Sequence, residues 1–308
     1  MNILAFDIGG TRGRCCLASA DGSIAHVQTL ERTQTDDGAM WLQRLLAAGK
    51  QIVQFAKQLQ VVAVSFGGPV APDGRVLSMH VPGWENVDLA GEMRKTFMLP
   101  VHIENDANSG ALGEFRFGAG RGCRYMAYFT VSTGIGGGVI LDGKLYRGAH
   151  GLAAEFGHMV LESRPDAPRY AAGKPGVLEA LASGPAIARE GEHLRAATGV
   201  KFNYKITAND VFEAVHRNES WAVQARDQAI AHLSRGVAAV LCAYDLERVV
   251  IGGGVSLAGD LLFEPLRAGV KKYLPHFLEG KAEIVPAALG DHAALLGAVA
   301  AGADLIAQ

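Results

Sequence analysis

Residues 5–11 read Ala5-Phe6-Asp7-Ile8-Gly9-Gly10-Thr11, an apolar strand that ends in a glycine-rich turn. The strand pattern resumes at Arg14–Ala18, and Asp21-Gly22 is typical of a hairpin before a third strand at Ile24–Leu30. The turn at 9–11 is therefore expected to join two strands, not to open a helix. Glycine in such a turn lets the backbone approach phosphate oxygens and present N–H donors to them.

The second half of the chain repeats this opening. A strand at Tyr125–Val131 is followed by the glycine-rich run Ser132–Gly138, a second strand and an Asp142-Gly143 turn. The repeat is far longer than a solenoid unit, so it predicts a duplicated domain. A third glycine run, Gly252–Gly254, follows a strand at Arg248–Ile251.

Each glycine-rich turn alone is equally typical of an ordinary tight hairpin, and their recurrence at strand ends favours phosphate binding. A dinucleotide fingerprint is the natural rival, but Gly134-x-Gly136 is followed by Val139 where a third glycine is needed. A P-loop needs Gly-Lys followed by Ser or Thr, and the sequence has none. We therefore expect phosphates to be held by hairpin turns, one from each half.

Two carboxylates stand at strand ends. Asp7 suits Mg²⁺, held through water, because this ion prefers oxygen ligands and keeps part of its hydration; the alternative is a turn-forming aspartate. Asp106 follows the strand Val101–Glu104 where a helix begins, the position at which open α/β sheets bind ligands. A carboxylate there can accept the proton of a hydroxyl acceptor during phosphoryl transfer. Its alternative role is to cap the helix.

A second polar cluster comprises Glu155, His158 and, some twenty residues on, Glu179. Together with Asn105, these side chains supply the donors and acceptors that a polyhydroxylated substrate requires. Taken singly, a histidine such as His158 is more often a core or surface residue, and Glu179 is simply a helix residue.

Composition narrows the class of protein. Of 308 residues, 49% are hydrophobic and 19% charged, with a net charge of −2, which favours a globular protein over a nucleic-acid or anionic-membrane binder. The sequence has neither a leader pattern nor an apolar run long enough to cross a bilayer, so we expect a soluble, cytoplasmic protein. The cysteines have no CxxC spacing and indicate idle thiols of a reducing compartment: Cys15, Cys16, Cys123 and Cys242.

The motifs occur in a set order along nearly the whole chain: AFDIGGT (5–11), FGGPV (66–70), VPGWENV (81–87), ENDAN (104–108), STGIGGGVI (132–140), AAEFGH (153–158), GKPGVLEALASG (173–184) and VVIGGGV (249–255). The chain thereby resembles the ROK family of repressors, open reading frames and kinases, which includes bacterial glucokinases and N-acetylmannosamine kinases.

The resemblance implies an α/β actin-like ATPase (ribonuclease H-like) fold, with two lobes around an active-site cleft. Residues 1–117 and 291–308 would form the smaller lobe, and residues 118–290 the larger. It implies ATP- and Mg²⁺-dependent phosphorylation of a hexose hydroxyl, of the glucokinase or hexokinase type at the 6-position, by a cytoplasmic homodimer without nucleic-acid or membrane partners. The alternatives are an N-acetylmannosamine (or other N-acetylhexosamine) kinase and a non-catalytic sugar sensor. A repressor is disfavoured because a helix-turn-helix domain would precede the first phosphate motif, which here begins at Asp7.

The resemblance also assigns roles, with Asp106 as the catalytic base and Asp7 as the residue that holds Mg²⁺ through water. The sugar contacts would be Gly68, Asn105, Asp106, Glu155, His158 and Glu179. The nucleotide contacts would be Asp7, Gly9, Gly10, Thr11, Arg12, Thr133, Gly134, Gly136, Gly137, Gly253 and Gly254.

One segment departs from the family pattern. Many members carry a zinc-binding CxCGxxGCxE run, whereas residues 170–179 here read YAAGKPGVLE, so that all three thiolates are replaced. A lone His158 cannot form a tetrahedral zinc site. We therefore expect no zinc site, and the segment Glu162–Ala172 must be ordered by packing or stay mobile.

Overall fold

The computed structural model describes residues 2–169, 173–199 and 203–307, so that residues 170–172 of the run compared with the zinc motif lie outside it. The strands and helices of its first half are β1 (Asn2–Ile8), β2 (Arg12–Ala18), β3 (Ile24–Glu31), α1 (Gly38–Val53), β4 (Leu59–Phe66), α2 (Leu89–Phe97), β5 (Val101–Asn105) and α3 (Asp106–Phe117). Those of its second half are β6 (Met126–Val131), β7 (Ile135–Leu141), β8 (Lys144–Leu145), α4 (Leu178–Ala182), α5 (Gly184–Ala197), α6 (Ala208–His216), α7 (Ser220–Tyr244), β9 (Arg248–Gly252), α8 (Asp260–Lys271), β10 (Glu283–Pro286) and α9 (Ala293–Ala307).

The strands form two sheets of the same topology. The first has the order β3-β2-β1-β4-β5, and the second, read in the same sense, has the order β8-β7-β6-β9-β10. In each sheet the first three strands are antiparallel neighbours, and the last two run parallel to the first. The duplication that the sequence predicts is thereby confirmed.

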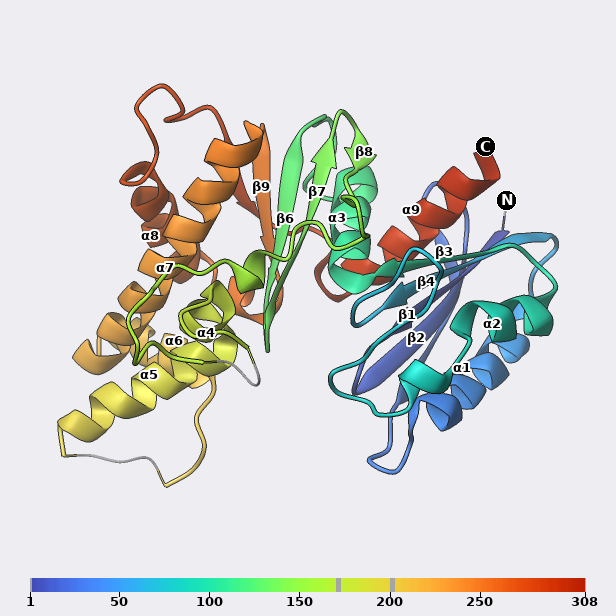
Figure 1. The fold of residues 1–308 in the computed structure, drawn as a ribbon, viewed down its shortest axis with the longest axis horizontal. Helices are drawn as coiled ribbons and strands as arrows, with labels where there is room; N and C mark the ends of the chain where they lie inside the picture. Colours follow the sequence, from blue (N-terminus) through green and yellow to red (C-terminus); the bar gives the residue numbers. More distant parts are fainter. Residues whose placement is uncertain (1, 170–172, 200–202, 308) are drawn as a thin grey trace.

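Each sheet is covered on both faces (Figure 1). Successive β1 residues point to opposite faces, so Leu4 and Phe6 pack with α1 and α2, whereas Ile3 and Ala5 pack with α9. In the second sheet, β6 packs with α7 and α8 on one face and with α3 on the other. Thus α3 follows the first sheet but packs on the second, and α9 follows the second sheet but packs on the first.

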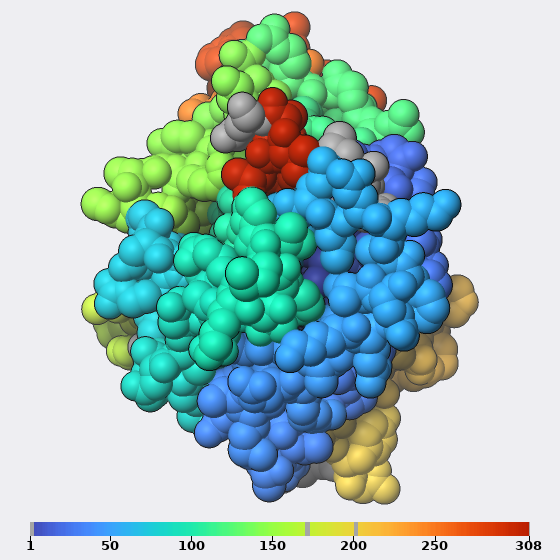
Figure 2. All heavy atoms as spheres, turned by 90° about the vertical axis from the view of Figure 1, so that its right-hand side faces the viewer, coloured from blue at the N-terminus to red at the C-terminus, as the bar shows by residue number. Residues whose placement is uncertain are grey.

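The two exchanged helices, α3 and α9, lie against one another between the sheets (Figure 1). Their approach requires glycine: a Cβ atom on Gly297 would fall 1.7 Å from the carbonyl oxygen of Ser109, and one on Gly113 would fall 2.2 Å from that of Ala293. Figure 2 faces the first lobe and shows the end of α9 (red) at the surface, between blue-to-teal segments of the first half and green segments of the second.

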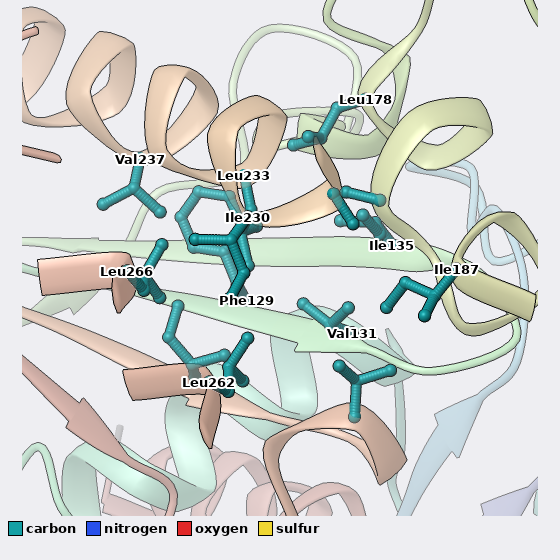
Figure 3. Close-up of a cluster of buried hydrophobic side chains, with 14 of the residues drawn as sticks. Phe129, Val131, Ile135, Leu178, Ile187, Ile230, Leu233, Val237, Leu262 and Leu266 are labelled. Atoms are coloured by element: carbon teal, nitrogen blue, oxygen red, sulfur yellow. The ribbon is translucent and has the colours of Figure 1, made fainter. Parts of the chain in front are cut away.

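The larger core lies between the second sheet and its outer helices (Figure 3). Phe129 of β6 is fully buried there with Ile230 and Leu233 of α7 and with Leu262 of α8. Helix α7 is 25 residues long, and one side of it remains polar around Asp227, as expected for a helix that packs on a core. No helix in the described ranges is long and apolar enough to span a membrane.

Candidate active site

The end of β5 and the start of α3 position Asp106. Asn105 caps the helix: its side-chain oxygen accepts from the backbone N–H groups of Ala107 at 2.9 Å and Asn108 at 3.1 Å. Its amide nitrogen donates to the carbonyl oxygen of Gly68 at 3.0 Å and to Asp106 Oδ1 at 3.1 Å. Asn105, the neighbour of Asp106, is therefore the main cap of α3, and the Oδ2 atom of Asp106 stays available for chemistry.

Asp106 has an unusual carboxyl group. It keeps solvent-accessible surface on its open side, but protein surrounds it closely elsewhere, and this desolvation raises its pKa to about 7. The negative charge of Asp7 raises the pKa further and that of Glu155 adds less, while the N–H of Ala107 opposes them. A carboxyl group that titrates near neutral pH is suited to accept a proton from a substrate.

Asp7 lies one residue before the end of β1, between two cross-strand neighbours. Its Oδ1 accepts from the hydroxyl of Ser65 at 3.1 Å, and its Oδ2 accepts from Arg14 Nη2 at 2.7 Å. The paired side chains of Asp7 and Arg14 are largely buried, at 15% and 10% exposed. A Cβ atom on Gly67 would lie 3.5 Å from the Cα atom of Gly9 and 3.7 Å from Asp106 Oδ2, so the first glycine turn and the Asp106 carboxylate adjoin.

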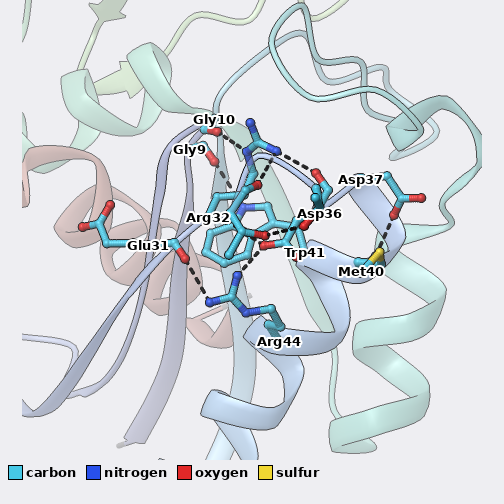
Figure 4. Close-up of polar contacts among 11 residues, drawn as sticks. Gly9, Gly10, Glu31, Arg32, Asp36, Asp37, Met40, Trp41 and Arg44 are labelled. Carbon is cyan, nitrogen blue, oxygen red and sulfur yellow. Dashed lines mark hydrogen bonds and ion pairs between the residues drawn. The ribbon is translucent and has the colours of Figure 1, made fainter.

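Two side chains hold the first glycine turn by hydrogen bonds to its carbonyl groups (Figure 4). Trp41 Nε1 donates to the carbonyl oxygen of Gly9 at 3.2 Å, and Arg32 Nε donates to that of Gly10 at 2.5 Å. These bonds fix the carbonyl groups, while Thr11 at the tip is exposed. The turn is thus a rigid element with an open outer side.

Arg12 is directed away from the tip of this turn. Its guanidinium forms an ion pair of 2.9 Å with Asp291, in the one-turn helix Gly290–His292 that precedes α9. Both side chains are substantially exposed, so the ion pair adds little stability and a nucleotide phosphate can compete with Asp291 for Arg12.

The second glycine turn joins β6 to β7 and contacts an unexpected partner. Glu179 Oε2 accepts from the backbone N–H of Ile135 at 2.8 Å, and a Cβ atom on Gly134 would fall 2.4 Å from the same oxygen. The Thr133 tip is exposed, like that of Thr11 in the first turn. Glu179, which the sequence assigns to the sugar, therefore also supports the second turn.

The third glycine run lies beside the second turn. Gly253 has a φ of 82°, and a Cβ atom there would fall 2.4 Å from the carbonyl oxygen of Val131, the last residue of β6. The carbonyl oxygen of Ser132 accepts from the N–H of Gly184 at 2.8 Å, which brings the start of α5 to the same place. Gly253 and Gly254 thus share one end of the second sheet with Thr133 and Gly134.

Glu155 precedes the one-turn helix Phe156–His158, and His158 is its last residue. The ring of Phe156 is buried and stacks on Phe129 with centroids 4.4 Å apart, which anchors the turn to the core. Glu155 and His158 point outward, 48% and 61% exposed, with 3.9 Å between Oε2 and Nε2. The pair is free to contact a ligand.

The segment that replaces the zinc motif is held by backbone hydrogen bonds in its described part. Leu161 N–H donates to the carbonyl oxygen of Gly176 at 2.8 Å, and Gly176 N–H donates to that of Pro168 at 2.9 Å. Leu178 N–H donates to the carbonyl oxygen of Met159 at 2.9 Å, directly after His158. Among the residues described, no cluster of three or more His, Cys, Asp or Glu side chains is arranged to hold a metal.

Sequence reasoning missed the polar neighbours of the predicted residues. Arg14 is a charged residue in the apolar strand β2, which is a visible signal in the sequence. Its partner follows only from the β1–β2 register, in which Arg14 lies opposite Asp7. Ser65 is likewise placed opposite Asp7 by the parallel β1–β4 register. His80 could not be anticipated: a Cβ atom on Gly10 would lie 3.1 Å from its Cβ atom.

Fold and site together define an α/β protein of the actin-like ATPase class with the site of a sugar kinase. The chain belongs to the ROK family, whose model matches residues 3–304. It is 35% identical to a glucokinase of Thermotoga maritima over 97% of this chain and 96% of the relative. Its structure resembles a ROK glucokinase from Streptomyces griseus in complex with glucose and AMPPNP (28% identity, TM-score 0.83, 99% and 100% of the chains covered). It also resembles a ROK hexokinase from Thermus thermophilus (28%, TM-score 0.87, 100% and 99% covered).

Proposed function

We propose that this chain transfers the γ-phosphoryl group of ATP to a hexose hydroxyl, with the 6-hydroxyl of glucose as its primary acceptor. The observation that carries the proposal is Asp106, a strand-end carboxyl group with a pKa of about 7 beside two exposed glycine-rich turns. The glucose and AMPPNP bound in the Streptomyces griseus relative support the choice of sugar and nucleotide.

In this reaction Asp106 is the general base. The hydroxyl oxygen forms a bond to the γ-phosphorus, the bond from phosphorus to the β–γ bridging oxygen breaks, and ADP leaves with that electron pair. The hydroxyl proton passes to Asp106. At neutral pH a large share of Asp106 is ionised, and its basicity is close to the optimum for accepting this proton.

Asn105 holds the base in place. All four of its hydrogen-bonding positions are used, by Gly68, Asp106 and two backbone N–H groups of α3. A sugar hydroxyl that contacts Asn105 must replace one of these bonds. We expect it to replace the bond to Asp106, at 3.1 Å, because Asp106 also faces solvent. Sugar binding would then leave the N–H of Ala107, at 2.9 Å, as the remaining donor to Asp106 Oδ1.

Mg²⁺ would enter with the nucleotide. Asp7 has the oxygen donors this ion prefers, but each oxygen already accepts one hydrogen bond, from Ser65 or Arg14. The donor set therefore fits a hydrated ion that Asp7 contacts through water. Bound there, Mg²⁺ would neutralise charge on the phosphates during transfer.

We infer that the lobes comprise residues 1–117 with 291–308 and residues 118–290. The packing of α9 on β1 and β4 supports the assignment of the closing helix to the first lobe, and α3 contacts both lobes. Asn105 and Asp106 then lie opposite Glu155, His158 and Glu179, so a sugar that touches both sets bridges the cleft and favours closure. The cytoplasmic location and the homodimer stay predictions. Cell fractionation tests the first, and light scattering tests the second.

A coupled ADP-release assay over a panel of sugars tests this function. We expect ATP- and Mg²⁺-dependent turnover, with glucose ahead of N-acetylmannosamine. Preference for N-acetylmannosamine would assign the alternative kinase activity. Sugar binding without turnover on any member would contradict the kinase and indicate a sensor.

A further inference from the structure

A buried carboxylate stands directly behind the proposed base. Glu104 is only 5% exposed and precedes Asn105 on β5. Its Oε1 accepts from Asn108 Nδ2 at 3.0 Å and from the backbone N–H of Asn105 at 3.2 Å. Its Oε2 accepts from Arg147 Nε at 2.6 Å. Glu104 thus joins the residues that carry and cap the Asp106 turn to a guanidinium from another part of the chain.

That guanidinium belongs to the opposite side of the cleft. Arg147 follows β8 of the second sheet, in the segment that leads to Glu155. The carbonyl oxygen of Arg147 accepts from the N–H of Ala153 at 3.2 Å, which closes this segment into a loop. The same loop contacts the first half again, because a Cβ atom on Gly151 would lie 3.2 Å from the carbonyl oxygen of Val70.

The Glu104 carboxylate depends on these partners. Burial opposes its charge, yet the neighbouring imidazole of His102 together with the charge and hydrogen bond of Arg147 brings its pKa below the usual value. A buried charge that loses its partner is costly, and Arg147 is the fully charged group in contact with it. His102 Nε2, at 3.8 Å, is too distant for a good hydrogen bond. Glu104 is therefore best stabilised while the Arg147 loop stays against β5.

We infer that Arg147 and Glu104 are positioning residues for the sugar site, an ion pair across the cleft that sets the Asn105–Asp106 turn relative to the Glu155–His158 turn. This inference rests on the proposed function. Within the described residues, the hydrogen bonds of the pair involve neither the phosphate turns nor the third glycine run, so it acts on the sugar half of the site and leaves the nucleotide half unchanged. Neutralising either partner would let the two sugar-contacting turns drift apart by the fraction of an ångström that phosphoryl transfer does not tolerate.

The test compares Arg147→Met, Arg147→Lys and Glu104→Gln with Arg217→Met. Arg217 serves as the matched control. It forms an exposed ion pair with Glu219 in the second half of the chain, far along the sequence from the proposed site residues. The readouts are kcat, the KM for glucose, the KM for ATP and the melting temperature. The wild-type protein provides the reference, because its inactivity on every sugar would overturn the proposed function and not this inference alone.

We expect Arg147→Met to lower kcat/KM for glucose by about tenfold to a hundredfold, the usual range for a lost charge-assisted hydrogen bond. The KM for ATP should stay within about twofold, since only sugar-contacting turns move. Arg147→Lys should recover part of the loss, because it restores the charge without the Nε geometry. The double variant Glu104→Gln/Arg147→Met should lose less than the product of the single losses. Arg217→Met should match the wild type.

Two results would overturn the inference in an active enzyme. One is an Arg147→Met variant with unchanged kinetics for glucose. The other is an equal loss of kcat/KM for glucose and for ATP that follows the melting temperature, with no recovery in Arg147→Lys. That result would show that the pair only stabilises the fold. If Arg147→Met does not fold, Arg147→Lys and Glu104→Gln give the same comparison.

Discussion

Glu179 Oε2 lies 2.8 Å from the backbone nitrogen of Ile135 and accepts its hydrogen bond, so the carboxylate expected to bind sugar also supports the second glycine turn. A Cβ atom on Gly134 would fall 2.4 Å from the same oxygen, so glycine at this position leaves the space that the carboxylate occupies. One residue thus connects the two halves of the site, the sugar side and the phosphate side.

This contact changes what a Glu179 variant should do. The sequence alone predicts that Glu179→Ala weakens sugar binding and spares ATP, whereas the structure predicts that both weaken, because the turn loses its support. Glu179→Gln keeps an oxygen for the Ile135 N–H and removes only the charge. We expect Glu179→Ala to raise the KM for both substrates and Glu179→Gln to raise mainly that for sugar. An Ala variant with wild-type KM for ATP would show that the turn needs no such support.

The pKa of Asp106 predicts how the rate depends on pH. A base with a pKa of about 7 is protonated and inactive below it, so kcat/KM for sugar should fall about tenfold for each pH unit below that value. A pH–rate profile measured at constant ionic strength checks this. An acid limb near pH 4, the ordinary range for a carboxyl group, would contradict the raised pKa.

The same shift has a consequence for stability. Because the folded-state pKa lies above the unfolded one, folding is favoured while Asp106 is protonated, and this contribution is lost as the pH rises from about 4 to about 7. Asp106→Asn removes the titrating group. We expect its melting temperature to match the wild type near pH 4 and to exceed it at pH 8. A constant difference across that range would rule out the shift.

The structure places Asp7, Asp106 and the glycine turns at or next to the ends of strands, as the strong apolar patterns predict, and their roles in binding and catalysis stay predictions. The repeat of the β-sheet is confirmed, and two similar openings in the sequence indicate it. Apolar residues recur at helical spacing from Met40 to Leu59, but helix α1 ends at Val53 and Leu59 begins β4. A single apolar residue fits both the helical and the strand spacing, so only the pairing with β1 decides that Leu59 lies in a strand.

Other features depend on contacts between distant residues. The local signals for helix α8 conflict, because the apolar spacing of Leu262, Leu266 and Val270 fits a helix whereas Pro265 lies inside it. The Glu104–Arg147 pair needs the register of two sheets and the path of a loop, and no local pattern carries that information. For the same reason the packing of α3 on the second sheet could not be anticipated, whereas the packing of α9 on the first sheet agrees with the expected place of residues 291–308 beside residues 1–117.

The departure from the zinc motif predicts a zinc-free protein. Backbone bonds to Gly176 and Met159 hold the described part of this segment and do not require thiolates. Elemental analysis of purified protein should find no stoichiometric zinc, and a chelator should leave the melting temperature unchanged. One zinc per chain would mean that ligands outside the compared run hold it.

The contact between α3 and α9 predicts a strong effect of one methyl group. Gly297→Ala places a Cβ atom 1.7 Å from the carbonyl oxygen of Ser109, a backbone atom that cannot move alone. We expect destabilisation of at least the roughly 1–3 kcal/mol typical of overpacking, measured by denaturant unfolding. Gly302→Ala is the matched control, since its nearest atom is a side-chain methyl of Ile3 at 3.0 Å. Equal stability of the two variants would contradict the close approach of these helices.

The most direct test of the account is the turnover of Asp106→Asn. Asparagine keeps the size of the side chain and an oxygen to accept from Asn105, so the fold and the binding of glucose and ATP analogue by calorimetry should be nearly unchanged. Without a base, kcat should fall by about 10²–10⁴. A purified variant that binds both ligands and turns over near the wild-type rate would contradict the assignment of Asp106 as the base.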